Sequence, residues 1–277
     1  MIFTQSLTFI QKRFYHARLK GKNVLITGAS SGIGKACAVE FAKQGSNLIL
    51  AARRLERLEE LKNELTQSYS NIKIHTMPLN IREKKNIDDA VQRLAVKDDI
   101  DILVNNAGLV IGLDHLSEVT EDSFDTMFET NVKGLVFMTQ AVLHGMKLNK
   151  KGHIINIGSV AGKESYPGGS IYCGSKHAVD AITRSLLFEL IDTPIRVSQV
   201  SPGLVNTEFS TVRFRGDKEK ADNVYKGLDP LVGQDIAELV VFTASRPPHV
   251  NICDMLVFPT AQAAATTVYR RPFNKDN

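Results

Sequence analysis

The stretch Thr27-Gly28-Ala29-Ser30-Ser31-Gly32-Ile33-Gly34 follows an aliphatic run and precedes a segment with helical spacing that begins at about Lys35. Glycines at these positions let the backbone turn tightly and approach a pyrophosphate, whose charge is stabilised by free N–H groups at the start of a helix. The spacing is G-x-x-x-G-x-G, not G-x-G-x-x-G, so a tight turn without a ligand is the alternative interpretation. Either way, the stretch predicts a strand, a turn and a helix in succession.

Outward from this turn, short aliphatic or β-branched runs alternate with longer helical patterns. Several runs are apolar at consecutive positions, as expected for strands that are buried on both faces. This alternation predicts an α/β fold: a Rossmann-type doubly wound parallel sheet in a three-layer αβα arrangement and a single domain. Between two strands, Leu55, Leu58, Leu61 and Leu65 are predicted to share one helical face. The predicted strands are 24–27, 47–51, 72–77, 102–105, 153–157, 196–200 and 255–258.

Composition excludes several classes of protein. The net charge is only +4 and no run of five Lys or Arg residues occurs, so we expect no nucleic-acid partner. No apolar run approaches the roughly 18 residues that a membrane span needs. Three cysteines without a C-x-x-C pair argue against a disulfide framework, and we expect no metal site.

The N-terminus differs in composition from the remainder of the chain. No acidic residue occurs before Glu40, whereas five Lys or Arg residues fall between positions 12 and 22. This pattern is typical of a mitochondrial transit peptide, and the alternative is an extension of a cytoplasmic protein. We therefore assign residues 1–21 to an N-terminal extension and residues 22–277 to the folded domain. Apolar residues recur in the extension at helical spacing, at Phe3, Leu7, Ile10 and Phe14.

Two arginines, Arg53 and Arg54, follow the second predicted strand. In NAD sites this place holds an acidic residue that accepts hydrogen bonds from the ribose hydroxyls. A guanidinium instead offers charge and several donors to a 2′-phosphate, so the sequence predicts NADP as the cofactor. The alternative is that both arginines begin a helix that faces solvent.

Tyr172 and Lys176 are four positions apart in a predicted helix, 171–190, so their side chains share one face. A free phenol has a pKa near 10, and a neighbouring ammonium together with a nicotinamidium would favour its phenolate. Ser159 ends a predicted buried strand, where its hydroxyl could hold a substrate carbonyl oxygen. A tyrosine and a lysine at this spacing are common by chance, so the prediction depends on all three residues together.

In their order, these motifs and Asn105-Asn106-Ala107-Gly108, Asn131 and Pro202-Gly203 resemble the short-chain dehydrogenase/reductases over about residues 22–258. The resemblance implies that Tyr172 is the general acid and base. Lys176 would bind the nicotinamide ribose and lower the tyrosine pKa. Ser159 would orient the carbonyl, and Asn131 would support a proton relay through water.

The resemblance also implies contacts with the cofactor. Residues 106–108 would lie beside the adenosine ribose, and Thr207 near the nicotinamide carboxamide. Asn80 stands where the family usually has an acidic residue facing adenine, and its amide can still donate and accept hydrogen bonds. The residues predicted to bind the cofactor are Gly28, Ser30, Ser31, Gly32, Ile33, Gly34, Arg53, Arg54, Asn80, Asn106, Ala107, Gly108, Tyr172, Lys176, Pro202, Gly203, Val205 and Thr207.

Residues 203–231 form a long connection rich in glycine, proline and charge, which predicts a lid over the substrate. Residues 202–217 and 257–260 resemble the NADP-dependent 3-hydroxy acid dehydrogenases, which oxidise short β-hydroxy acids such as serine and allo-threonine and commonly form tetramers. A small anionic substrate needs a guanidinium, and the lid carries Arg213 and Arg215. In an extended segment only one of them faces inward. We choose Arg213, and the alternative is that both face solvent.

The sequence therefore predicts an NADP-dependent oxidoreductase that interconverts a small 3-hydroxy acid and its carbonyl form by hydride transfer, as a homotetramer. The hydroxy acid would be of the serine, allo-threonine or 3-hydroxypropionate type. The alternative within enzymes is a carbonyl reductase for bulkier neutral ketones. A non-catalytic nucleotide sensor on the same fold would not need Ser159, Tyr172 and Lys176 together.

Overall fold

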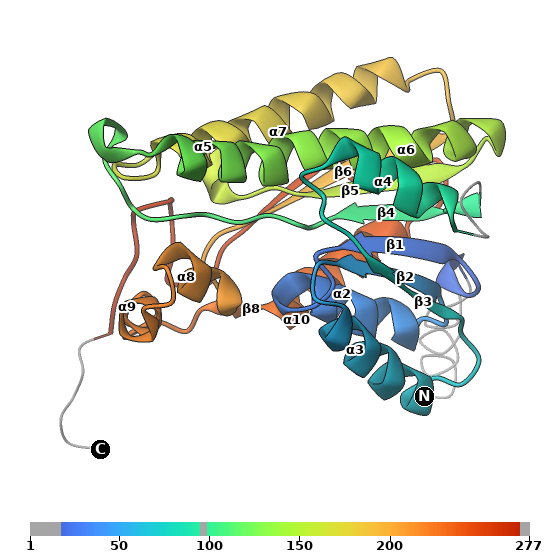
Figure 1. The fold of residues 1–277 in the computed structure, drawn as a ribbon, viewed down its shortest axis with the longest axis horizontal. Coiled ribbons are helices and arrows are strands. Elements are labelled where there is room, and N and C mark those ends of the chain that lie inside the picture. Colours follow the sequence, from blue (N-terminus) through green and yellow to red (C-terminus); the bar gives the residue numbers. More distant parts are fainter. Residues whose placement is uncertain (1–17, 95–98, 272–277) are drawn as a thin grey trace, which may run out of the picture.

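The computed structural model describes residues 18–94 and 99–271 (Figure 1). Its main sheet has the strand order β3-β2-β1-β4-β5-β6-β9, and every neighbouring pair is parallel. The chain changes direction across the sheet between β1 and β4, which creates the switch point where parallel sheets bind ligands. The strands are β1 (Asn23–Thr27), β2 (Asn47–Ala52), β3 (Ile74–Pro78), β4 (Ile102–Asn105), β5 (Gly152–Ile157), β6 (Ile195–Pro202) and β9 (Asp254–Val257).

Helices cover both faces of this sheet and create two apolar cores (Figure 1). Alternate side chains of β1 enter different cores: Val24 and Ile26 pack on one face and Leu25 on the other, as the two-residue period of a strand requires. The predicted doubly wound α/β fold is confirmed. One layer holds α2 (Gly32–Lys43), α3 (Leu55–Ser68) and α10 (Gly233–Ala244), and the other holds α4 (Lys84–Gln92), α5 (Glu121–Phe128), α6 (Gly134–Leu148) and α7 (Ser170–Glu189).

Two local predictions need correction. The first helix begins at Gly32, three residues before the predicted start at Lys35, so its first turn includes the last two glycines of the motif. In α3, Leu58, Leu61 and Leu65 are buried as predicted, but Leu55 is exposed. Leu55 is the first residue of that helix and lies beyond the edge of the core.

Two residues before the predicted boundary at residue 22 contact the domain. Leu19 is buried in the core beside α2 and α10, and its carbonyl accepts a hydrogen bond of 2.8 Å from Ser46 Oγ. Arg18 donates to the carbonyl of Ser245 at the end of α10. The described part of the predicted extension therefore packs against the domain. The rest of it, residues 1–17, lies outside the described residues.

The predicted lid, residues 203–231, contains more regular structure than its composition indicates. It holds β7 (Val205–Asn206), α8 (Glu208–Arg213) and α9 (Lys218–Asn223), and the next short strand, β8 (Leu231–Val232), pairs with β7. Figure 1 places α8 and α9 together at one end of the molecule. No helix of the described residues is long and apolar enough to span a bilayer.

Candidate active site

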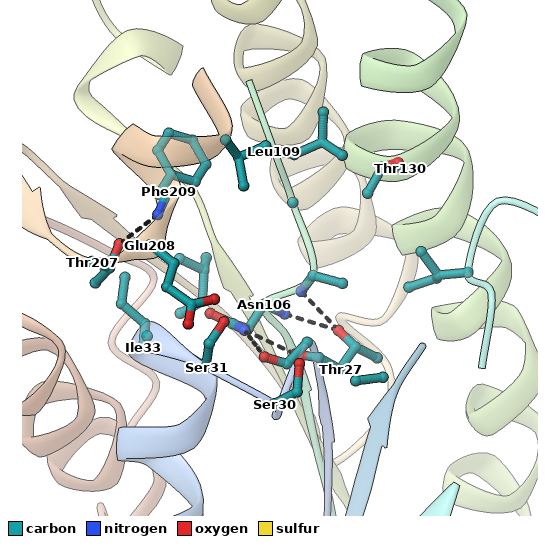
Figure 2. Close-up of a pocket in the computed structure, with 18 of the residues that line it drawn as sticks. Thr27, Ser30, Ser31, Ile33, Asn106, Leu109, Thr130, Thr207, Glu208 and Phe209 are labelled. Atoms are coloured by element: carbon teal, nitrogen blue, oxygen red, sulfur yellow. Dashed lines mark hydrogen bonds between the residues drawn. The ribbon is translucent and has the colours of Figure 1, made fainter. Parts of the chain in front are cut away.

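A cleft of about 340 Å³ opens where β1, β4 and β5 end, and the lid borders it (Figure 2). All but three of the residues predicted for cofactor, catalysis and substrate line this cleft. The exceptions are Gly34, Asn131 and Arg213. The lid residues Glu208, Phe209 and Val212 also line the cleft, although the sequence analysis gave them no role.

The glycine-rich turn is shaped to approach a ligand closely. Gly28 and Gly32 have φ values of +67° and +53°, which side chains rarely adopt. A Cβ on Gly34 would come within 2.3 Å of the Gly28 carbonyl oxygen, so Gly34 allows the turn to pack although it does not line the cleft. The first turn of α2 contains no acidic residue, and Ser31 makes no side-chain cap. The free N–H groups at this end of α2 fit a pyrophosphate.

Hydrogen bonds join the end of β1 to the loop after β4 (Figure 2). Thr27 Oγ1 accepts from the backbone N–H groups of Asn106 and Ala107, both at 3.0 Å. The Asn106 side chain donates in return to the carbonyl oxygens of Thr27 at 2.9 Å and Gly28 at 3.3 Å. These bonds hold the two loops at the switch point in a fixed relative position, and both loops line the cleft.

The cleft is cationic beyond the end of β2. The Arg54 guanidinium donates to Ser30 Oγ at 3.0 Å and to Ser31 Oγ at 3.1 Å, and Arg53 also lines the cleft. Arg54 therefore lies against the glycine-rich turn instead of extending freely into solvent. This set of donors fits a phosphate on the adenosine ribose.

Ser159, Tyr172 and Lys176 are buried together at the end of β5 and in the first half of α7. Ser159 Oγ accepts from the N–H of Ala161 and also hydrogen-bonds Tyr172. Lys176 Nζ donates to the carbonyl oxygen of Ile157 at 2.8 Å. The structure thus brings together the three side chains that the sequence analysis selected.

Burial controls the pKa values of this group. It raises the pKa of Tyr172, and the Ser159 hydrogen bond opposes this shift only in part. Burial also lowers the pKa of Lys176 to about 8. Desolvation of the phenolate outweighs the favourable contacts with Ser159 and Arg213, so the pKa of Tyr172 lies above its ordinary value. The lowering of this pKa by Lys176 stays a prediction.

Asn131 lies in a π-helical turn, Glu129–Lys133, and both polar atoms of its side chain are engaged. Its Oδ1 accepts from the N–H of Leu109 at 2.8 Å, and its Nδ2 donates to the Leu109 carbonyl and to Ser175 Oγ. These contacts fix the loop after β4 against α7. Because Asn131 does not line the cleft, its relay through water stays a prediction.

The two lid arginines have different partners. Arg213 ends α8, so the argument for an extended segment does not apply to it. Its guanidinium donates to Tyr166 Oη at 2.6 Å, and its charge acts on Tyr172. Arg215 pairs with Asp114 at 2.7 Å and is largely exposed. Arg213 is therefore the arginine on the catalytic side, although in this structure it lies beside the cleft and not in its wall.

Phe209 contributes an apolar wall that the sequence analysis missed. Its ring meets the ring of Tyr172 edge to face, with centroids 5.8 Å apart. Its position two residues after Thr207 was the available signal, because Thr207 caps the short helix to which Phe209 belongs. Among residues 18–94 and 99–271, no cluster of three or more His, Cys, Asp or Glu side chains could hold a metal ion.

Comparisons with known proteins agree with this geometry. A family model described as short chain dehydrogenase matches residues 22–218. The NADP-dependent 3-hydroxy acid dehydrogenase of Schizosaccharomyces pombe is 49% identical over 257 residues, which cover 92% of this chain and 99% of that protein. Sulfoacetaldehyde reductase 2 of Chromohalobacter salexigens is 43% identical over 242 residues, which cover 87% of this chain and 95% of that protein.

A solved structure, the closed form of a serine dehydrogenase complexed with NADP+, is also similar. It superposes with a TM-score of 0.83 at 41% identity and covers 90% of this chain and 100% of that one. The similarity therefore extends over most of the chain.

Proposed function

This chain belongs to the short-chain dehydrogenase family, and from that premise we propose that it is an NADP-dependent oxidoreductase interconverting a small 3-hydroxy acid and its carbonyl form. The observation that carries this proposal is the placement of Ser159, Tyr172 and Lys176 in one nucleotide-sized cleft whose other end is cationic. Relatives whose names include NADP and a hydroxy acid support it.

In this mechanism NADP, when bound, accepts or supplies the hydride. Ser159 Oγ donates a hydrogen bond to the reacting oxygen of the substrate and holds it beside Tyr172. The Tyr172 hydroxyl gives its proton to that oxygen during reduction and takes it back during oxidation. Lys176, one helical turn further along α7, is charged below its pKa of about 8 and stabilises the phenolate left on Tyr172.

At the other end of the cleft, Arg53 and Arg54 would hold the 2′-phosphate, and Ser30 would assist them. The start of α2 would hold the pyrophosphate. A carboxylate at the end of β2, which NAD sites use for the ribose hydroxyls, is absent from the sequence there.

A small acidic substrate is favoured over a bulky neutral ketone. The names of two relatives specify a 3-hydroxy acid and sulfoacetaldehyde, small molecules in which a carboxylate or a sulfonate lies close to the reacting carbon. Arg213 supplies a cation beside Tyr172, at the end of the cleft where such a group would lie. Phe209 and Val212 narrow the same end.

The test is a panel of alcohols assayed with NADP+. Serine, allo-threonine and 3-hydroxypropionate should be oxidised with higher kcat/KM than neutral alcohols of equal size. A preference for bulky neutral alcohols would favour the carbonyl reductase instead. No oxidation of any substrate, with NADP(H) bound, would favour a nucleotide sensor.

We further propose that the enzyme is a homotetramer. Phe188 and Ile191, near the end of α7, are 79% and 85% exposed, which supports a subunit contact at that end of the helix. Light scattering would test the tetramer.

We also propose that residues 1–21 direct the enzyme to mitochondria. Fusion of residues 1–21 to a fluorescent protein would test the targeting.

A further inference from the structure

Glu208, the first residue of α8 in the lid, reaches across the cleft to the cations beyond β2. Its Oε1 accepts from Arg57 Nη1 at 2.6 Å and its Oε2 from Arg54 Nη1 at 3.2 Å. Figure 2 shows its carboxylate directed toward the turn that carries Ser30 and Ser31. Arg54, which we assign to the 2′-phosphate, thus already binds a carboxylate of the protein itself.

The Arg54 guanidinium binds both Glu208 and the glycine-rich turn. While Arg54 donates through Nη1 to Glu208, it donates through Nη2 to Ser30 and Ser31 of the glycine-rich turn. A carboxylate and a phosphate both accept paired hydrogen bonds from a guanidinium, so the two anions seek the same donors. Two anions at one cation also repel each other.

We propose that Glu208 competes with the cofactor's 2′-phosphate for Arg54, so that this lid residue limits the selectivity for NADP(H) over NAD(H). The inference rests on the proposed use of NADP. It predicts that the native carboxylate weakens the binding of nucleotides that carry a 2′-phosphate and leaves other nucleotides unaffected.

The charge state of Glu208 agrees with this role. Burial would raise its pKa, but the hydrogen bonds from Arg57 and Arg54 outweigh that effect and lower it. The carboxylate is therefore ionised at neutral pH. Its side chain and that of Arg54 are 49% and 39% exposed, so water and salt weaken the pair enough for a phosphate to displace it.

The competition also links the adenosine end of the cleft to the lid. The far end of α8 is held separately, because the N–H of Gly112 donates to the Arg213 carbonyl at 2.8 Å and Arg213 donates to Tyr166. Displacement of Glu208 would therefore release only the end of α8 nearest Arg54. The contacts on the catalytic side of the helix would remain.

Binding of two nucleotides without nicotinamide tests the proposal. We would titrate adenosine 2′,5′-bisphosphate and adenosine 5′-monophosphate into the full-length protein by calorimetry. Glu208→Gln is expected to raise the affinity for the bisphosphate by up to about fivefold at low salt, the range of exposed ion pairs, and to leave the monophosphate unchanged. Glu208→Asp keeps the charge on a shorter side chain, so its gain should be smaller.

Glu219→Gln is the matched control, because it removes the same charge from α9, where the side chain is exposed. A bisphosphate affinity that is unchanged or reduced in Glu208→Gln would overturn the proposal. An equal gain for both nucleotides, or the same gain in Glu219→Gln, would also overturn it. Either result would indicate that the change in the protein's net charge, and not the loss of the Glu208–Arg54 pair, strengthens nucleotide binding. Equal affinity of the wild-type protein for the bisphosphate and the monophosphate would instead contradict the proposed use of NADP. The inference about Glu208 would then fail as well.

Discussion

Tyr172 shows how one residue's surroundings define its chemistry. The side chain is only 7% exposed, and burial keeps its pKa above the ordinary value despite the hydrogen bond from Ser159. The phenol is therefore protonated at neutral pH and ready to act as an acid in reduction. Oxidation requires the phenolate, which needs the positive charges that the family resemblance places beside it.

Tyr172→Phe keeps the ring and removes the hydroxyl group that carries the transferred proton. Turnover should fall by about 10²–10⁴, the usual contribution of general acid–base catalysis, whereas NADPH binding should persist because the ring still fills its place. Steady-state rates at saturating cofactor, together with a fluorescence titration of NADPH, would check both parts. Wild-type turnover in this variant would refute the assignment.

Arg213→Met keeps apolar bulk and removes the charge beside the catalytic tyrosine. A hydrogen bond to a charged group contributes about 1.5–3 kcal/mol, so kcat/KM for 3-hydroxy acids should fall by about 10- to 150-fold while neutral alcohols are spared. Arg215→Met is the control, because Arg215 is 57% exposed and pairs with Asp114. Equal losses for acids and neutral alcohols would mean that the substitution disturbs the lid.

At the scale of the element, α10 has an unusual end. Its last turn contains no basic residue, yet Arg196 of β6 reaches its carbonyls. The Arg196 guanidinium donates to the carbonyl oxygens of Ala244 at 2.9 Å and Val250 at 3.1 Å, and more weakly to those of Thr243 and Arg246. A cation here satisfies carbonyls that a helix leaves unpaired and complements its dipole.

Arg196→Met should therefore lower the free energy of unfolding by about 1–3 kcal/mol, because partly buried carbonyls lose their donor. Urea denaturation at neutral pH would measure the change. Arg184→Met is the control, since Arg184 is 64% exposed and its pair with Asp180 should contribute less than about 1 kcal/mol. Similar losses in the two variants would show that the contacts of Arg196 with α10 do not stabilise the fold.

The main-sheet strands could be predicted from the sequence because each is a short apolar run between helical patterns, a local signal. The β4 prediction, 102–105, has the observed bounds. The ends of other elements differ by a few residues. Pairing with β9 extends β6 to Pro202, whereas β3 begins at Ile74, two residues after the predicted start. The helical turns inside the lid had no such run to indicate them.

Candidate site residues could be predicted where a motif fixes their spacing, as in Tyr172 and Lys176. Contacts between distant segments could not. Glu208 meets Arg54 across 154 positions, and Arg213 meets Tyr166 across 47. Such pairs depend on how the lid docks over the cleft, which no local pattern specifies.

At the scale of the whole molecule, buried ionisable groups determine how stability depends on pH. His153 lies in β5 inside the sheet, with Nε2 at 2.8 Å from Ser198 Oγ and no partner for Nδ1 among the described residues. Burial, and then the charge of Arg196, lower its pKa well below the ordinary value. The fold therefore holds this imidazole neutral, whereas the unfolded chain can protonate it.

The sign of the effect follows from this difference. A lowered folded pKa means that the unfolded state binds more protons below about pH 6.5, so the free energy of unfolding falls as pH decreases from there. The loss approaches about 1.4 kcal/mol per pH unit until the folded pKa is reached. Carboxylates with a lowered pKa, such as Asp180, lose their contribution only at lower pH, so the window between pH 5 and 7 isolates the histidines.

His153→Gln removes the titrating group and keeps a side chain that can bond Ser198. Its stability at pH 7 should fall because the side-chain shape differs, but the slope of stability against pH between 5 and 7 should flatten relative to wild type. His115→Gln, at an exposed position, should keep the wild-type slope. Urea midpoints measured every half pH unit would separate the two effects. A slope that stays the same in His153→Gln would mean that the imidazole is protonated within the fold or that the sheet opens before it titrates.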